Sequence, residues 1–135
     1  MATSPAFAST PKVGVATIST ANTASDGTGT IGTIFTAGTS GSRVDKIVVV
    51  AISASTSLGM IRLFIHNGTT AFLYKEIPVS AGTSGVGSAA MHFGAELDLE
   101  VLGSALPIFL PTGYSIRAST HIAESFNVIC IGADL

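Results

Sequence analysis

Of the 135 residues of the chain, only six are Lys or Arg and eight are Asp or Glu, which leaves a net charge of −2. Charged residues make up 10% of the sequence, against about 25% in typical soluble domains, and the mean hydropathy is +0.60. This composition excludes a basic surface for nucleic acid, and the longest strongly apolar run, Ile47 to Ile52, is too short for a membrane helix of about 20 residues. Because charge keeps a free monomer soluble, we expect a subunit that buries much of its surface against other subunits.

The first twelve residues differ from the rest of the chain, because Pro5 and Pro11 bracket small residues around a lone Phe7. Proline disfavours a place in a β-ladder, so we expect residues 1–12 to form an extended N-terminal arm. Pro5, Phe7 and Pro11 are the expected assembly contacts of this arm with another chain, and a disordered terminus is the alternative. The segment lacks the basic and apolar regions of a secretory signal peptide, so we expect none.

Short apolar runs alternate with clusters of Ser, Thr and Gly in the remaining sequence, a pattern typical of β-structure. No stretch of helical length has apolar residues at a period of 3.6, and residues 88–101 alternate apolar and polar side chains as a half-buried strand does. The sequence therefore predicts an all-β fold, with residues 13–135 as a single antiparallel β-sandwich of jelly-roll type with eight or nine strands. The expected strands span 13–20, 30–36, 43–53, 59–67, 70–79, 90–101, 105–110, 113–121 and 125–133.

Three local signals punctuate these strands. Asn67-Gly68 predicts a type I′ hairpin turn, because both residues tolerate positive φ. A second turn is expected at Pro111-Thr112-Gly113. Pro78 should end the strand that carries Tyr74, because proline has no N–H to donate to a ladder.

Strands 43–53 and 125–133 are apolar on both faces, unlike the alternating strands elsewhere. A strand of this kind in an all-β protein is either covered on both sides by its own chain or exposed at a subunit interface. The sequence leaves both possibilities open.

Residues able to bind a metal are few and scattered. His66, His92 and His121 have no spacing typical of metal ligands, and we expect three independent side chains. One strand face carries the candidate calcium ligands Glu96, Asp98 and Glu100. Neighbours on that face are roughly 7 Å apart, so they need help from another strand, and a solvated face is the favoured interpretation.

Catalytic motifs are also missing from the sequence. It contains no Gly-x-Ser-x-Gly nucleophile elbow and no distinguishable Ser/His/Asp set, so we expect no enzyme, no catalytic residue and no cofactor. The single Cys130 lies in an apolar run and is expected to be a buried, inert thiol. A hydrolase using two carboxylates remains an alternative, as does a carbohydrate-binding β-sandwich, although the chain has no Trp and only two Tyr to stack on sugars.

Two stretches of the sequence carry a resemblance. One is Arg62-Leu-Phe-Ile-His-Asn-Gly68 with Tyr74-Lys-Glu-Ile-Pro78, and the other is Pro111-Thr-Gly-Tyr-Ser-Ile-Arg-Ala-Ser-Thr-His121 with Phe126-Asn-Val128. Over residues 30–135 the chain resembles small all-β structural proteins encoded among the virion genes of tailed bacteriophages. The resemblance implies a head decoration (cement) protein or a related tail component, and such cement proteins are often jelly-roll-like trimers on the capsid. It supplies no active-site residue.

The function expected from the sequence is therefore that of a capsid decoration protein that binds and stabilises the head shell as a homo-oligomer, with a trimer favoured. Its expected partners are further copies of itself and the major capsid protein or another virion protein, with no nucleic acid and no membrane. The expected location is the capsid surface of the virion, and the host cytoplasm during assembly. A tail, neck or fibre-associated virion subunit is the main alternative.

Overall fold

Two large antiparallel sheets hold most of the strands in the described part of the chain, which in this computed structural model comprises residues 9–53, 55–83, 92–94, 99–100, 103–104 and 108–135. The first sheet has the strand order β1 (Thr10–Ile18), β13 (Phe126–Asp134), β3 (Ser42–Ala51) and β11 (Ile108–Leu110), with β8 (His92–Gly94) also paired to β3. The second has the order β2 (Gly32–Thr36), β12 (Ser115–Thr120), β5 (Gly59–His66) and β6 (Ala71–Val79). Two short pairs lie outside them, β4 (Ser55–Thr56) with β7 (Gly82–Thr83) and β9 (Leu99–Glu100) with β10 (Gly103–Ser104).

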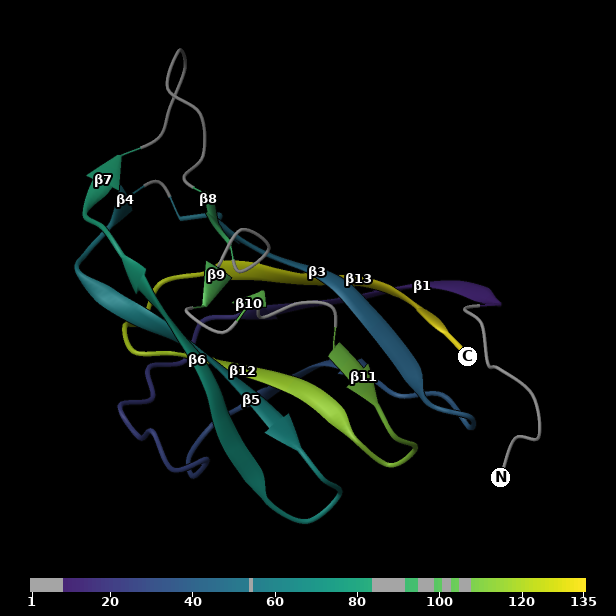
Figure 1. The fold of residues 1–135 in the computed structure, drawn as a ribbon. Helices are drawn as coiled ribbons and strands as arrows, with labels where there is room; N and C mark the ends of the chain where they lie inside the picture. The colour runs from purple at the N-terminus through teal and green to yellow at the C-terminus, as the bar shows by residue number, and fades with distance from the viewer. Residues whose placement is uncertain (1–8, 54, 84–91, 95–98, 101–102, 105–107) are drawn as a thin grey trace.

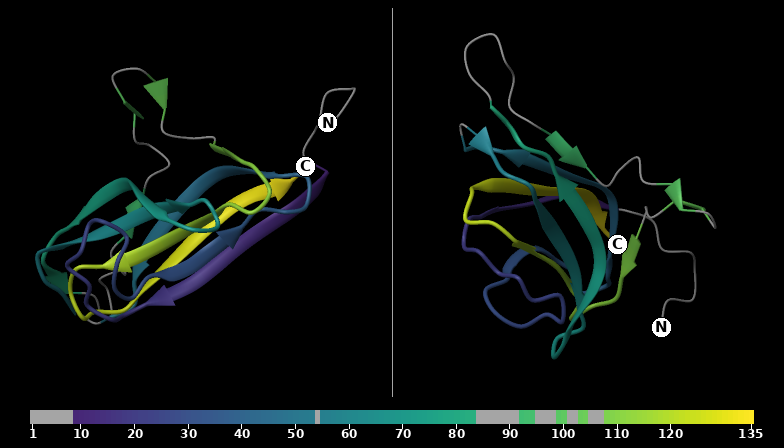
Figure 2. Two further views of the ribbon diagram at one scale, coloured as in Figure 1. Left: turned by 90° about the horizontal axis from the view of Figure 1, so that it is seen from below. Right: turned by 90° about the vertical axis from the view of Figure 1, so that its left-hand side faces the viewer.

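The two sheets lie face to face, as Figures 1 and 2 show from three directions, and one hydrophobic core fills the space between them. Side chains that alternate along each strand supply this core, because successive residues of a strand point to opposite faces. Its fully buried members include Ile47, Val49, Phe126 and Val128 from the first sheet and Phe35, Ile61, Leu63 and Ile116 from the second. The prediction of an all-β antiparallel sandwich is confirmed, and no helix occurs in the described residues.

Strand β1 begins at Thr10, so residues 10–12, which the sequence assigns to the arm, pair instead with the end of β13. Pro11 lies opposite Ala133 inside this pairing. The prediction that Pro78 ends its strand is also wrong, because β6 continues to Val79 with Pro78 opposite Met60. Both prolines lie on edge strands, where one side of the strand has no ladder and the missing N–H does no harm.

The edge strand β1 is tied to the second sheet by an inward-pointing lysine. The Lys12 ammonium donates to the Thr36 carbonyl, lies 3.2 Å from Asp134 Oδ1 and sits 4.9 Å above the centre of the Phe35 ring. Gly14 permits this close approach, because a Cβ there would lie 2.2 Å from the Ile34 carbonyl oxygen. A charged side chain turned inward is one of the ways in which proteins protect a strand edge from pairing with other chains.

The Asn67-Gly68 tip of the β5–β6 hairpin is where the sequence places it, but the turn is not of type I′. Gly68 has a φ of +96°, whereas no described residue other than glycine has a positive φ. The register also differs from the predicted one, since the strand pairing ends at His66 and Ala71 and the Asn67 N–H donates to the Thr70 carbonyl, which places Gly68 and Thr69 at the tip. The Asn67 side chain accepts from the N–H groups of Thr69 and Thr70, which stabilises the turn.

The predicted turn at Pro111 is confirmed, with the Tyr114 N–H donating to the Pro111 carbonyl and Gly113 at a φ of +87°. The strands that it joins belong to different sheets, because β11 pairs with β3 while β12 pairs with β2 and β5. The chain therefore crosses from one layer to the other at this turn.

Candidate functional site

The outer face of the first sheet is apolar across three adjacent strands. Val13 of β1 lies opposite Ile131 of β13. Two residues further along the strands, Val15, Ile129 and Val48 lie side by side on the same face. Val50 of β3 extends the same face. We call this surface the apolar outer face; its members are Val13, Val15, Val48, Val50, Ile129 and Ile131.

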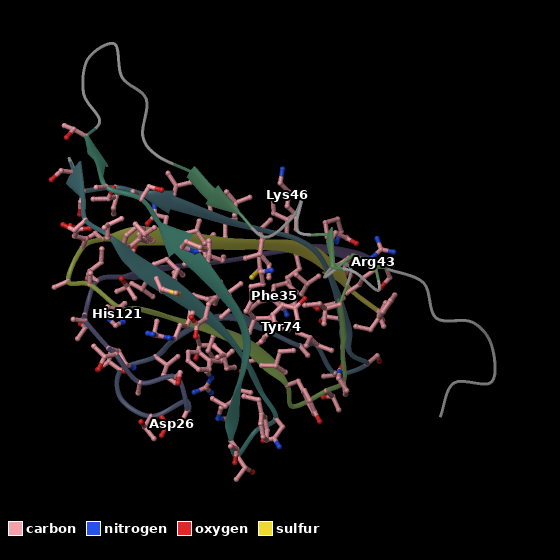
Figure 3. The ribbon with its side chains drawn as sticks, turned by 60° about the vertical axis from the view of Figure 1, so that its left-hand side comes forward. Asp26, Phe35, Arg43, Lys46, Tyr74 and His121 are labelled. Atoms are coloured by element: carbon pink, nitrogen blue, oxygen red, sulfur yellow. The ribbon has the colours of Figure 1, made fainter. Side chains whose placement is uncertain are left out.

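Several of these side chains are strongly exposed. The exposed fractions are 60% for Val13, 58% for Val15 and 41% for Ile131, and Val48, Val50 and Ile129 are half-buried. Lys46 lies opposite Ile131 at one corner and is directed away from the core in Figure 3. At the other end Thr17 donates to Asn127 Oδ1 over 2.8 Å. An apolar surface with a polar rim of this kind is typical of a protein–protein contact.

The outer face of the second sheet has the opposite character. Its residues Arg62, Phe64 and Ser119 alternate with core residues and yet are buried, with exposed fractions of 7%, 0% and 1%. The connection 19–31 between β1 and β2 lies against this face: the Asn22 N–H donates to the Thr120 carbonyl, and Ala21 forms a parallel bridge with Thr120. The loop covers the part of this face around Arg62, while Leu73 of β6, opposite Phe64, keeps an exposed fraction of 41%.

The Arg62 guanidinium is held from three sides. Its Nη1 donates to the Asn22 carbonyl over 3.2 Å, its Nη2 lies 3.3 Å from His121 Nδ1, and its Nε lies 3.6 Å from Glu76 Oε1. A buried cation requires such partners, since burial without them is strongly unfavourable. We therefore interpret Arg62 as a structural residue that anchors the loop.

The metal-ligand candidates whose side chains the structure describes, His66 and His121, have separate partners. His121 contacts Arg62, His66 accepts from the Gly68 N–H, and no group of three metal-ligating side chains is found in the part of the chain searched. Glu96 and Asp98 lie outside the described residues. Glu100 belongs to β9, whose backbone alone is described.

Cys130 is the buried thiol that the sequence predicts, because its side chain points into the core from β13. Burial raises its pKa to about 12, so the thiol stays protonated and unreactive at neutral pH.

The expected assembly contacts have different outcomes. Pro5 and Phe7 lie outside the described residues, and Pro11 is exposed on β1.

The sequence identified the two-sided apolar strands that correspond to β3 and β13, but it did not identify Val13 and Val15 as part of the same surface. A signal was present, since Val-Gly-Val-Ala alternates large and small residues, but their place beside Ile129 and Ile131 depends on the pairing of β1 with β13.

Comparison with known proteins identifies no relative: no protein-family model, no curated protein and no solved structure matches the chain. No helix among the described residues is long and apolar enough to cross a membrane.

Proposed function

We propose that the protein is a structural subunit of a phage particle, namely a capsid decoration protein that binds the head shell as a homo-oligomer. The observation that carries this proposal is the apolar outer face, which exposes valine and isoleucine side chains from three neighbouring strands. Only 10% of the residues are charged, so the chain has little charge with which to prevent self-association through such a face.

The energy available from this face is large enough for assembly. Full burial of a Val or Ile side chain contributes about 1.5–3 kcal/mol. Because the six members are only partly exposed, covering them contributes on the order of 5 kcal/mol per protomer. Several protomers joined in a ring and docked on a shell multiply this contribution.

The path of the chain supports a jelly-roll form of the sandwich, which suits a virion protein. Successive long strands alternate between the two sheets, from β1 to β2, to β3 and to β5; among the described strands of five residues or more, β5 and β6 are the only consecutive strands that are neighbours in one sheet. The resemblance to virion proteins of tailed phages favours a trimer, with the major capsid protein as its partner on the shell. A tail, neck or fibre-associated subunit would use the same face, and the copy number in purified particles separates these cases.

The N-terminal residues enter the proposal as a second contact. We infer that Pro5 and Phe7 bind a neighbouring subunit or the shell, since Phe7 is a large apolar side chain in a small-residue context. Deleting residues 2–8 leaves β1 intact from Thr10 onward and should weaken binding to particles.

The decisive experiment replaces Val15 by Glu. A carboxylate in the middle of the apolar outer face should convert the oligomer to a monomer in sedimentation velocity and abolish binding to decoration-free capsids. The matched control is Phe72→Glu, because Phe72 is exposed to a similar extent, 54%, but lies on β6 of the other sheet.

The proposal fails if Val15→Glu assembles and binds capsids as the unchanged protein does. It also fails if the unchanged protein is a monomer at high concentration and does not bind particles.

A further inference from the structure

A polar cavity of about 340 Å³ lies on the outer side of the second sheet, away from the apolar outer face. Three elements that are distant in sequence form it: the loop 26–31, the tip of the β5–β6 hairpin and strand β12. The polar side chains that line it are those of Asp26, Thr28, His66, Thr69, Thr70 and Arg117. Its volume is in the range of small-ligand sites.

The loop that forms one wall is held in place from within. The buried Asn22 side chain donates from Nδ2 to the carbonyls of Thr28 (2.9 Å) and Thr30 (3.0 Å), and its Oδ1 accepts from the Ala24 N–H. Gly27, at a φ of +89°, packs so closely that a Cβ there would lie 2.7 Å from the Ala71 carbonyl oxygen. A wall fixed in this way loses little entropy when a ligand binds.

The cavity presents one cationic donor. Arg117 projects from the central strand β12, and its Nε donates to Ser115 Oγ over 3.2 Å, which orients the guanidinium. No described carboxylate forms an ion pair with it. A guanidinium so placed matches a carboxylate, which accepts two parallel N–H bonds from it.

The other lining groups suit hydroxyls. Asp26 Oδ1 accepts from the N–H of Thr28 over 3.1 Å and from its hydroxyl over 2.6 Å. Chiefly the Thr28 hydroxyl, and then its N–H, hold the pKa of Asp26 below its usual range, so the carboxylate remains an acceptor. His66 Nδ1 accepts from the Gly68 N–H, which assigns the ring proton to Nε2 and makes that nitrogen a donor.

From this arrangement we propose that the cavity binds a saccharide unit that carries a carboxylate, as uronic acids do. The carboxylate of the ligand pairs with Arg117. The hydroxyls of the ligand form hydrogen bonds with Asp26 and with the threonine hydroxyls of the hairpin tip. The Arg117 guanidinium and the Asp26 carboxylate carry opposite charges, so a ligand with a single negative charge is disfavoured less than a doubly charged phosphate. No Phe, Tyr or Trp is among the described residues that line the cavity, so binding depends on polar contacts and should be in the millimolar range.

The test is an NMR titration of the ¹⁵N-labelled full chain with D-glucuronate. We expect saturable shifts of the amide signals of Gly27, Thr28, Thr69 and Thr70. D-Glucose, which has the same ring without the carboxylate, should bind at least about tenfold more weakly. Acetate and inorganic phosphate are the control ligands that carry a negative charge without the sugar ring.

Two variants probe the residues directly. Arg117→Gln and Asp26→Asn should each weaken glucuronate binding at least about tenfold, whereas Arg43→Gln, on β3 of the other sheet, should leave it unchanged. If Arg117→Gln does not fold, Arg117→Lys keeps the charge but loses the two-bond geometry, and it should also bind more weakly.

The inference is overturned if glucuronate gives no saturable shifts, or if glucose binds equally well. It is also overturned if acetate or phosphate binds as tightly as glucuronate, or if the Arg117 variants bind normally. None of these results bears on assembly through the apolar outer face, which the Val15→Glu experiment tests separately.

Discussion

The outer faces of the two sheets differ in how far the chain itself covers them. The second sheet buries Arg62 and Phe64 beneath segments of its own chain, while the first sheet leaves Val13 and Val15 largely exposed. A buried charge needs partners at fixed distances, and only the same chain can guarantee them in every copy. An apolar surface needs only shape and area, which another subunit can provide. The difference shows which face the chain covers by folding and which it leaves exposed, and the exposed face is the one that the proposed assembly uses.

The largest effect that can test this comparison is a truncation on the covered face. Phe64→Ala should lower the free energy of unfolding by about 3–5 kcal/mol, because the ring is fully buried and leaves a cavity. Val15→Ala on the apolar outer face should change it by no more than about 0.5 kcal/mol in the monomer. Urea unfolding at low protein concentration measures both, and similar values for the two variants would contradict the assignment of the faces.

Removal of the buried cation should have the next largest effect. Arg62→Ala takes away the partner of Glu76, of the Asn22 carbonyl and of His121. Because Glu76 keeps a side-chain exposure of 34% and part of its hydration, we expect a loss of about 2–3 kcal/mol, less than for a fully buried pair.

The control for that variant is Arg43→Ala, whose ion pair with Asp45 is exposed on both sides. It should change the stability by no more than about 0.5 kcal/mol. If the two variants lose equal amounts of unfolding free energy in urea, the loop does not depend on Arg62.

A smaller effect is expected when the loop loses its internal support. Asn22→Ala removes bonds to Ala24, Thr28 and Thr30 and should destabilise the protein by about 1–3 kcal/mol. Hydrogen exchange should quicken around residues 22–31 while the core strands stay protected. Asn127→Ala, on the rim of the apolar outer face, is the matched control and should leave this exchange unchanged.

The smallest effect concerns the corner where β13 ends beside β1. The Ser42 hydroxyl, and secondarily Lys12, hold the pKa of Asp134 below its usual value. A carboxyl with a lowered pKa stabilises the fold above its unfolded pKa of about 3.9 and loses this contribution as the pH falls through the lower folded value. The melting temperature should therefore fall less steeply below about pH 4 in Asp134→Asn than in the unchanged protein. If the melting temperatures of the two proteins fall in parallel as the pH is lowered, the acid sensitivity comes from other groups.

The strands could be predicted from the sequence because their signal is local. Alternation and turn residues placed β2, β3, β5, β6, β12 and β13 within a few residues of their observed bounds. The errors at Pro11 and Pro78 share one cause, since proline is excluded only from strands paired on both sides, and edge positions are not encoded locally. The hairpin at Asn67 was located by its residues, but its turn type depended on a register that ends at His66 and Ala71.

Composition and periodicity by themselves determined that this protein is all-β, low in charge and apolar on both faces of two strands. Only the tertiary structure decided which face stays open, because that depends on β1 pairing with β13, residues more than a hundred positions apart. The same holds for the cavity: Asp26, His66 and Arg117 come from three segments with no shared motif. Side-chain alternation is a property of neighbouring residues, whereas a surface or a site is a property of strand order, which long-range packing selects.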